Sequence, residues 1–182
     1  MTIFVSSDLH FFHQNIIKFC PDTRGQWETV EEMNEGLIEY HNKTVKPNDT
    51  FYHLGDFSFG DSQKTKNVLS RMNGHKRFIK GNHDYWDSDK SAVDMLLSYN
   101  TYGEVKYQKQ TFCLFHYPIW SWNKKRYGSI HLHGHLHQHV TDIMGRIVNV
   151  CYDNNGRYLT FDEIFDNMKS IPIVESNHHL TH

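Results

Sequence analysis

The stretch Ile3-Phe4-Val5-Ser6-Ser7-Asp8-Leu9-His10 joins a short run of β-favouring residues directly to an aspartate and a histidine. The same form recurs twice: residues 51–54 lead into Gly55-Asp56, and residues 77–79 lead into Gly81-Asn82-His83-Asp84. Between the first two runs, residues 28–43 place apolar side chains at helical spacing behind a capping-box pattern, Thr29 with Glu32. Strands alternating with helices predict a parallel sheet in which the segments after the strands meet at one edge.

The rest of the chain adds helices and then becomes rich in strands. We expect helices over 61–72 and 88–98, a last short helix after the capping-box pair Thr160 and Glu163, and strands over 104–108, 111–116, 129–133, 146–151 and 157–160. This order predicts an α/β fold in which two mixed β-sheets pack face to face and are flanked by helices. With 182 residues and no break in composition, we expect a single domain over 1–170 and a frayed tail over 171–182.

The composition excludes several classes of protein. The formal net charge is −2, with 38% hydrophobic and 14% aromatic residues, so we expect neither disorder nor tight binding of duplex nucleic acid. No apolar run approaches about 18 residues and the first residues lack a secretion signal, which predicts no membrane association and a cytoplasmic location. The three cysteines lie far apart and predict no disulfide framework. The 15 histidines stand out, because histidine binds metals and transfers protons near neutral pH.

Side chains that can bind metal follow strand after strand. They are Asp8, His10, Asp56, Asn82, His83, His116, His135 and His137. Alternate residues of an extended segment point to one side, so we expect Asp8 and His10 to hold one ion, and His135 and His137 to reach two neighbouring ions. Carboxylate, amide and imidazole donors favour a mid-row divalent metal. Taken alone, the histidine-rich segment 131–139 is equally typical of a tract that merely adsorbs metal ions.

These segments, in their order along the chain, resemble the five motif blocks of the calcineurin-like metallophosphoesterase superfamily. The blocks DxH, GD, GNH, H and GHxH match residues 8–10, 55–56, 81–83, 116 and 134–137. The resemblance implies an αββα sandwich and a dinuclear site, with one ion held by Asp8, His10, Asp56 and His137 and the other by Asp56, Asn82, His116 and His135. The imidazole-rich donor set favours manganese, iron, zinc, nickel or cobalt over magnesium or calcium, and we expect manganese.

The hypothesis for the mechanism is hydrolysis of a phosphoester. A hydroxide that bridges the two ions attacks phosphorus, and His83 protonates the leaving alkoxide as general acid. Asp84 is expected to orient the imidazole of His83. Two divalent ions, two carboxylates and one hydroxide leave one positive charge, which attracts a phosphate.

Two departures narrow this hypothesis. The second block reads Gly55-Asp56-Phe57-Ser58-Phe59-Gly60-Asp61 and lacks the acid and arginine of the GDxxDRG block in the phosphoprotein phosphatases, which argues against a protein phosphatase. The short chain, without room for a cap domain, is more similar to compact bacterial or viral members, so we expect a phosphodiesterase acting on small substrates, including nucleotide-like ones. The alternatives are a phosphomonoesterase and a binding module that keeps the fold without turnover. The sequence predicts no oligomeric state.

Candidate substrate contacts lie in several loops. They are His13, Arg24, Asn82, Trp122, Lys124 and Arg126. In the segment 117–127, rings beside cations could stack a base and bind a phosphate. The alternative is that the tryptophans cover the core and the cations are solvated. For His13, a solvated position at the start of a helix is an equal alternative.

Overall fold

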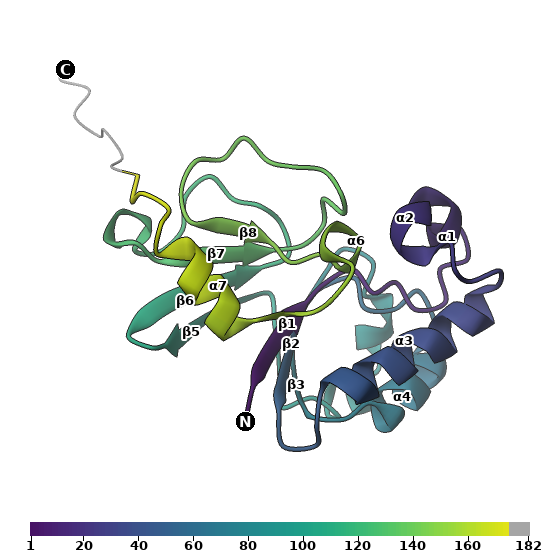
Figure 1. Ribbon diagram of the computed structural model, residues 1–182. Coiled ribbons are helices and arrows are strands. Elements are labelled where there is room, and N and C mark those ends of the chain that lie inside the picture. Colours follow the sequence, from purple (N-terminus) through teal and green to yellow (C-terminus); the bar gives the residue numbers. More distant parts are fainter. Residues whose placement is uncertain (175–182) are drawn as a thin grey trace.

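The computed structural model describes residues 1–174 and contains two β-sheets with helices around them (Figure 1). The first sheet has the order β4-β3-β2-β1-β9, with β1–β4 parallel and β9 antiparallel to β1. Its strands are β1 (Ile3–Ser6), β2 (Thr50–Leu54), β3 (His75–Ile79), β4 (Ser98–Asn100) and β9 (Leu159–Thr160). The second sheet has the order β5-β6-β7-β8, with only β5 and β6 antiparallel. Its strands are β5 (Tyr102–Tyr107), β6 (Gln110–Phe115), β7 (Ile130–His133) and β8 (Ile147–Asn149). Both sheets are therefore mixed, as expected.

The alternation of side chains along the strands gives the first sheet two buried faces. One face carries Phe51 and Phe78, which pack in one apolar cluster with Leu37 of α3 (Val30–Thr44) and Val68 of α4 (Ser62–Arg71). The opposite face contributes to a second cluster that joins the two sheets; its members include Val5, Leu54 and Ile79 from the first sheet and Phe112, Leu114 and Leu132 from the second. The sandwich of two sheets flanked by helices is confirmed.

Both predicted capping boxes are present. At the start of α3, the Thr29 hydroxyl accepts a hydrogen bond from the Glu32 backbone N–H, and the Glu32 side chain accepts one from Thr29 N–H. Thr160 and Glu163 do the same at α7 (Phe161–Met168), whose Phe161 ring stacks on Phe112 at 4.7 Å. Each box satisfies backbone donors that a helix start otherwise leaves free, which explains why both helices begin at these residues.

The helix expected over 88–98 is shorter than predicted. Only α5 (Lys90–Val93) is helical, and the chain then enters β4, which pairs with β3. The structure also has three helices of four residues, α1 (Ile16–Phe19), α2 (Pro21–Arg24) and α6 (Tyr152–Asn155). Of these, only a helix after His13 was considered from the sequence. 3₁₀ turns cover Tyr85–Ser88 and Lys125–Tyr127.

The described helices are all too short or too polar to cross a membrane. Of the expected tail over 171–182, residues 175–182 lie outside the described residues. The carbonyl of Ile171 accepts a hydrogen bond from Arg146 Nε.

Candidate metal centre

The candidate ligands follow the carboxyl ends of strands from both sheets, which is where open α/β sheets bind ligands. Asp8 and His10 follow β1, Asp56 follows β2, and Asn82 follows β3. From the second sheet, His116 follows β6, and His135 and His137 follow β7. Segments far apart in the sequence thus meet where the edges of the two sheets come together.

The backbone at several of these residues is left-handed. Asp8, His10, Asp56, His135 and His137 have φ values of 58°, 51°, 57°, 70° and 49°. The expectation that Asp8 and His10 lie in an extended segment is therefore wrong: both residues are left-handed, with Leu9 between them outside that conformation, and this backbone turns both side chains to the site. For residues other than glycine this conformation costs about 1–2 kcal/mol each and is typical of functional positions.

Two glycines allow these loops to approach one another. A β-carbon at Gly81 would overlap the backbone N and the carboxylate of Asp56, and one at Gly134 would overlap the carboxylate of Asp8. The backbone therefore passes directly beside both acids, where no larger residue fits.

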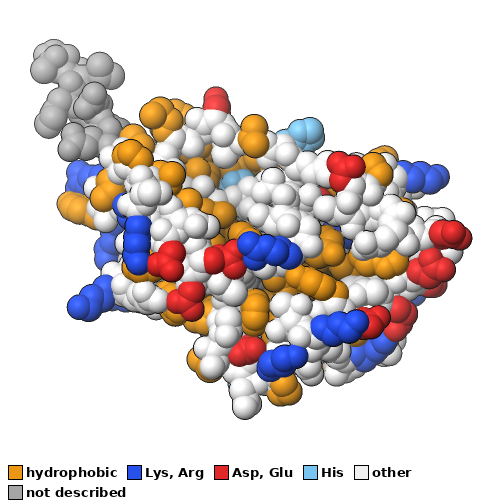
Figure 2. All heavy atoms as spheres, in the orientation of Figure 1, with side chains coloured by type: hydrophobic (Ala, Val, Ile, Leu, Met, Phe, Trp, Pro, Cys, Tyr) orange, Lys and Arg blue, Asp and Glu red, His pale blue; other side chains and the backbone are white. Residues whose placement is uncertain are grey.

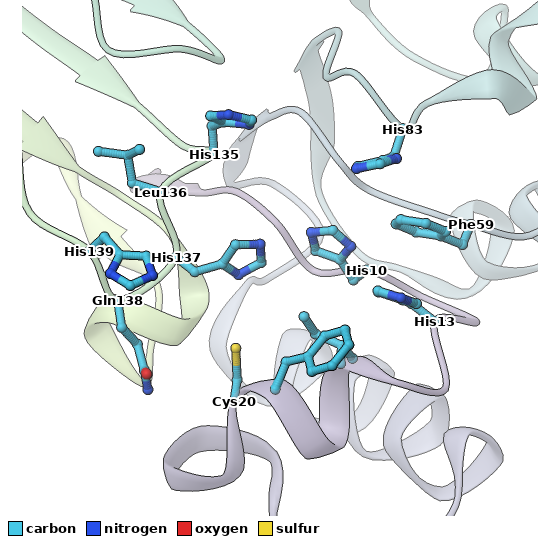
Figure 3. A pocket seen from close by; sticks show the side chains of 12 residues that line it. His10, His13, Cys20, Phe59, His83, His135, Leu136, His137, Gln138 and His139 are labelled. Atoms are coloured by element: carbon cyan, nitrogen blue, oxygen red, sulfur yellow. The ribbon is translucent and has the colours of Figure 1, made fainter.

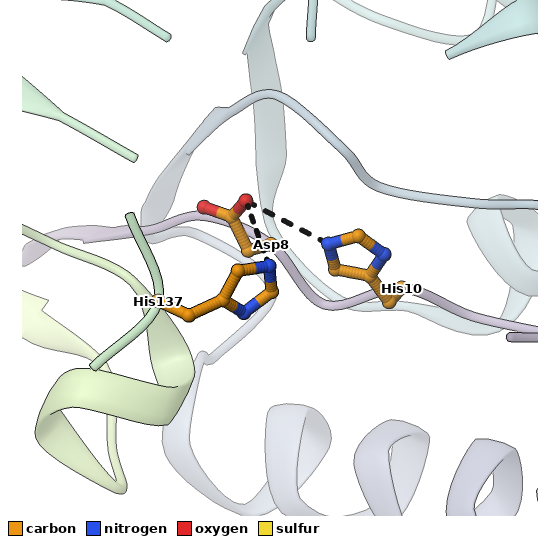
Figure 4. Close-up of side chains that lie close together, drawn as sticks. All are labelled: Asp8, His10 and His137. Carbon is orange, nitrogen blue, oxygen red and sulfur yellow. Dashed lines mark ion pairs between the residues drawn. The ribbon is translucent and has the colours of Figure 1, made fainter. Parts of the chain in front are cut away.

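Asp8, His10 and His137 form the first group of donors (Figure 4). Asp8 Oδ1 lies 3.7 Å from His10 Nε2 and 3.9 Å from His137 Nε2. His10 Nε2 also lies 3.8 Å from Asp56 Oδ2. His10 is buried, and neither of its ring nitrogens has a hydrogen-bond partner among the described residues. A buried polar atom without a partner is costly, so these nitrogens fit a ligand better than a purely structural role.

Asp56, Asn82, His116 and His135 form the second group. His116 Nε2 lies 3.6 Å from Asp56 Oδ2 and 2.9 Å from Asn82 Oδ1, and His135 Nδ1 lies 3.1 Å from the same amide oxygen. His116 Nδ1 lies 2.8 Å from the Leu54 carbonyl, which fixes the ring with Nε2 toward the site. Asp56 therefore lies next to both groups of donors, as expected for a carboxylate that bridges two ions.

These spacings suit a metal centre. Donors about 2.0–2.1 Å from one ion lie about 2.8–3.4 Å apart in octahedral or tetrahedral geometry. The observed separations of 2.9–3.9 Å need only small side-chain adjustments to meet that geometry. The residues present thus fit divalent ions in both groups.

The electrostatics of the site favour added positive charge. Burial raises the pKa of Asp56 to about 6, and the neighbouring Asp8 and Asp84 carboxylates also raise it. Burial lowers the pKa of His10 to about 4, although Asp8 opposes this shift, so His10 offers a neutral ring nitrogen at pH 7. Burial alone raises the pKa of Asp8, but the nearby histidines outweigh burial and lower it. A cation between these carboxylates would relieve their mutual repulsion.

Asp153 is a functional residue that the sequence reasoning missed. His137 Nδ1 donates to Asp153 Oδ2 at 2.8 Å, which leaves His137 Nε2 toward Asp8. Such carboxylate–histidine pairs orient the rings that bind metals. Asp153 lies at the start of α6, 16 positions after His137, and no pattern in the sequence marks it as the partner of that histidine.

Arg24 explains how Asp153 is held, and its expected contact with the substrate phosphate is not supported. Its side chain is fully buried, and the guanidinium donates to Asp153 and to the carbonyls of Asp8 and Leu9 at 2.7–3.0 Å. These bonds tie α2 to the segment after β1.

A third group of possible donors is Cys20 with His137 and Asp153. His137 and Asp153 are already bonded to each other, and we assign this group no ion.

Asp84 does not bond to the His83 imidazole, contrary to the expectation. Its Oδ1 accepts hydrogen bonds from Phe57 N and Trp86 Nε1, and its Oδ2 accepts from Asp56 N and Gly81 N, all at 2.8–2.9 Å. Burial raises the pKa of Asp84, although these four donors oppose that shift. Asp84 thus joins the loops after β2 and β3.

His83 lies at the exposed side of the site. Its backbone N–H donates to Asp56 Oδ1 at 2.8 Å, and its Nε2 lies 4.0 Å from Asp56 Oδ2. The His83 side chain is 41% exposed, so it can reach a bound substrate.

A pocket of about 420 Å³ opens beside the metal ligands. His10, His83, His135 and His137 line it together with His13, which the sequence proposed as a substrate contact (Figure 3). Asn82 lies beside these residues through its contacts with His116 and His135.

Trp122, Lys124 and Arg126 do not line this pocket. The Trp122 ring is buried 5.2 Å from the His131 ring on the outer face of the second sheet, and its Nε1 donates to the Ser129 carbonyl. Trp122 and the exposed cations Lys124 and Arg126 fit the alternative that the loop covers the core, whereas Trp120 is 72% exposed. No residue of the segment 117–127 lines the pocket beside the metal ligands, so the expected base-stacking role is not supported there. On the face shown in Figure 2, acidic and basic side chains are interspersed.

Known proteins resemble this chain in sequence and in fold. The sequence model of a family described as calcineurin-like phosphoesterase matches residues 1–182. An uncharacterized protein of Methanocaldococcus jannaschii is 36% identical over 142 residues, which cover 77% of this chain and 72% of that protein. The Gene 66 protein of Mycobacterium phage L5 is 26% identical over 205 residues, with 95% and 97% coverage. A solved structure of a protein of unknown function from Aquifex aeolicus has a similar fold, with a TM-score of 0.71, 22% identity, and coverage of 91% of this chain and 98% of that one.

Proposed function

The chain belongs to the calcineurin-like phosphoesterase family, and from this premise we propose that it uses two divalent transition-metal ions, with manganese preferred, to hydrolyse small phosphodiesters. The observation that carries the proposal is His10. This buried imidazole lies 3.7–3.8 Å from two carboxylates and has no hydrogen-bond partner for either nitrogen among the described residues. A metal ion between the three side chains would explain why the ring stays buried.

The proposed ligand sets share Asp56. Asp8, His10, Asp56 and His137 hold one ion, and Asp56, Asn82, His116 and His135 hold the other. When bound, the ions would lower the pKa of a water toward neutrality and stabilise the charge on the phosphoryl oxygens. The chain itself fixes the geometry: Leu54 orients His116, and Asp153 orients His137.

His83 is the proposed general acid. Its exposed ring stands over the pocket, and its backbone N–H is fixed on the shared Asp56 carboxylate. From this place the ring can donate a proton to the alkoxide that leaves when the phosphorus–oxygen bond breaks. Asp84 supports His83 only indirectly, by holding the loop from which it projects.

The pocket favours a diester over a monoester. Its lining includes no lysine or arginine among the described residues. A monoester carries close to two negative charges at pH 7, because its second pKa is about 6, whereas a diester carries one. A site with one net positive charge and no further cation suits the diester.

Hydrolysis of two aryl esters tests the proposal. With manganese added, bis(p-nitrophenyl) phosphate is expected to be cleaved faster than p-nitrophenyl phosphate, and His10→Gln is expected to abolish turnover of both. Lys124→Ala, at an exposed position outside the pocket, is the matched control and should keep full activity. Faster cleavage of the monoester would favour a phosphomonoesterase, and no cleavage of either ester by the metal-loaded chain would favour a binding module.

A further inference from the structure

One wall of the pocket is apolar and lies directly beside the proposed metal ligands (Figure 3). Ile16 and Phe19 of α1 supply part of it, and Phe59, from the segment after β2, supplies the part next to His10 and His83. The Phe59 ring centroid lies 5.1 Å from that of His10 and 4.6 Å from that of His83.

His13 holds Phe59 in place. The two rings stack at 4.1 Å with an interplanar angle of 11°. Phe19 meets the same His13 ring edge-on at 6.2 Å. Phe59 and Phe19 are thus two parts of one aromatic cluster, although they come from different segments of the chain.

This cluster leaves aromatic surface open to the pocket. Phe19 is 66% exposed and Phe59 is 38% exposed. Single exposed apolar residues are common on protein surfaces. Two exposed aromatic residues that line the same pocket as the proposed general acid are different, because both are open to a ligand in that pocket.

The charge and the size of the pocket suit one uncharged group of a ligand. Among the described residues, neither acidic nor basic side chains other than histidine line it. Its volume of about 420 Å³ is in the lower part of the range of about 300–1,000 Å³ for small-molecule sites. A ligand group next to the phosphate is therefore apolar or weakly polar, and a polymer would extend beyond the pocket.

From these observations we propose that Phe19 and Phe59 form a subsite for a flat aromatic or heteroaromatic ring attached to the scissile phosphate. The inference rests on the proposed function, since the metal ligands must hold the phosphate. It assigns the ring of the substrate to this wall and not to the tryptophan-containing segment 117–127.

Direct binding of phosphonates tests the subsite, because their carbon–phosphorus bond is not hydrolysed. Isothermal titration calorimetry of the manganese-loaded full chain measures its affinities for phenylphosphonate, cyclohexylphosphonate and methylphosphonate. Phenylphosphonate is expected to bind about tenfold tighter than methylphosphonate, which corresponds to a modest stacking contribution. Cyclohexylphosphonate should bind clearly more weakly than phenylphosphonate, because its ring has similar bulk but no flat π-face.

Variants show which residues cause the preference for phenylphosphonate. Phe19→Ala, at an exposed position, and Phe59→Leu, which keeps apolar bulk, should each reduce the phenyl preference, measured as the ratio of the affinities for phenylphosphonate and methylphosphonate, to threefold or less. Trp120→Ala is the matched control, since Trp120 is 72% exposed but lies in the other loop. It should leave the tenfold preference intact.

Several results would overturn the proposal. Equal affinities for phenylphosphonate and methylphosphonate, or for phenylphosphonate and cyclohexylphosphonate, would exclude a ring subsite. The proposed phosphoester hydrolysis would still stand. Loss of the preference in Trp120→Ala, with no effect of the phenylalanine variants, would assign the ring to the segment 117–127. If none of the phosphonates binds the metal-loaded chain although it cleaves bis(p-nitrophenyl) phosphate, the subsite is refuted and the proposed hydrolysis stands. If the chain neither binds a phosphonate nor cleaves the diester, the proposed function fails together with the subsite.

Discussion

Asp84→Asn tests the role that the structure gives to this buried acid. The carboxylate accepts hydrogen bonds from Phe57 N, Trp86 Nε1, Asp56 N and Gly81 N, and the residue is 1% exposed. An asparagine oxygen can accept only one of the two pairs of donors. Its NH₂ group would face the other pair, so two buried N–H groups would lose their acceptor.

The magnitude follows from these two groups. Each buried donor left without an acceptor costs about 1–3 kcal/mol, so the variant should lose about 2–6 kcal/mol in free energy of unfolding. Urea denaturation followed by circular dichroism measures this loss at pH 7. Asp61→Asn is the matched control: Asp61 caps α4 through Lys64 N, and asparagine caps helices equally well, so its effect should be close to zero.

One result would refute this reasoning. If Asp84 acted by orienting the imidazole of His83, Asp84→Asn would leave the unfolding free energy within about 1 kcal/mol of the wild type. The pH profile of turnover would then change instead. Such a result would restore the role that the sequence suggested for Asp84.

Four further predictions follow from the site and the core. His83→Ala should lower kcat by about 10²–10⁴-fold while metal analysis still finds two ions per chain; loss of an ion would instead make His83 a ligand. Asp153→Asn should weaken manganese binding by about 10–100-fold in titration calorimetry, because His137 loses its charged partner, and unchanged affinity would contradict that role. Manganese at 100 times its Kd should raise the unfolding free energy by about 2.7 kcal/mol per occupied site, and a chelator should reverse the gain; a melting temperature insensitive to both would argue against the site. Burial lowers the pKa of His41 to about 4, so the unfolded chain binds this proton more tightly than the folded chain does. The free energy of unfolding should therefore fall by up to about 3 kcal/mol as the pH drops from about 6.5 to 4. His41→Gln should remove that part of the pH dependence, and an equally steep dependence of the unfolding free energy on pH in the variant would contradict it.

The order of strands and helices was largely predictable, because it depends on local signals; β4 was missed, and the expected strands 146–151 and 157–160 are shorter in the structure. Periodicity and the capping boxes at Thr29 and Thr160 predicted α3 and α7, and both boxes form. The motif blocks predicted which side chains meet at the sheet edge, because each follows a strand. The short helices α1 and α2 carry little periodicity, and the end of the expected helix over 88–98 was overridden by the pairing of β4 with β3.

The partners of the site residues were less predictable. Sequence spacing gave Asp8 and His10 an extended backbone, but tertiary contacts hold both in left-handed conformations. Arg24 and Asp153 are 129 positions apart, and no local pattern signals that they meet. Such long-range contacts depend on packing and not on the order of neighbouring residues.

The central claim is that two ions share Asp56 between the loops of the two sheets. Equilibrium dialysis against manganese, followed by elemental analysis, measures it directly. We predict two manganese ions per chain for the wild type, and loss of at least one from Asp56→Asn, with the Asp61→Asn control unchanged. A single ion in the wild type, or two ions retained with unaltered affinity when Asp56 is replaced, would contradict the account.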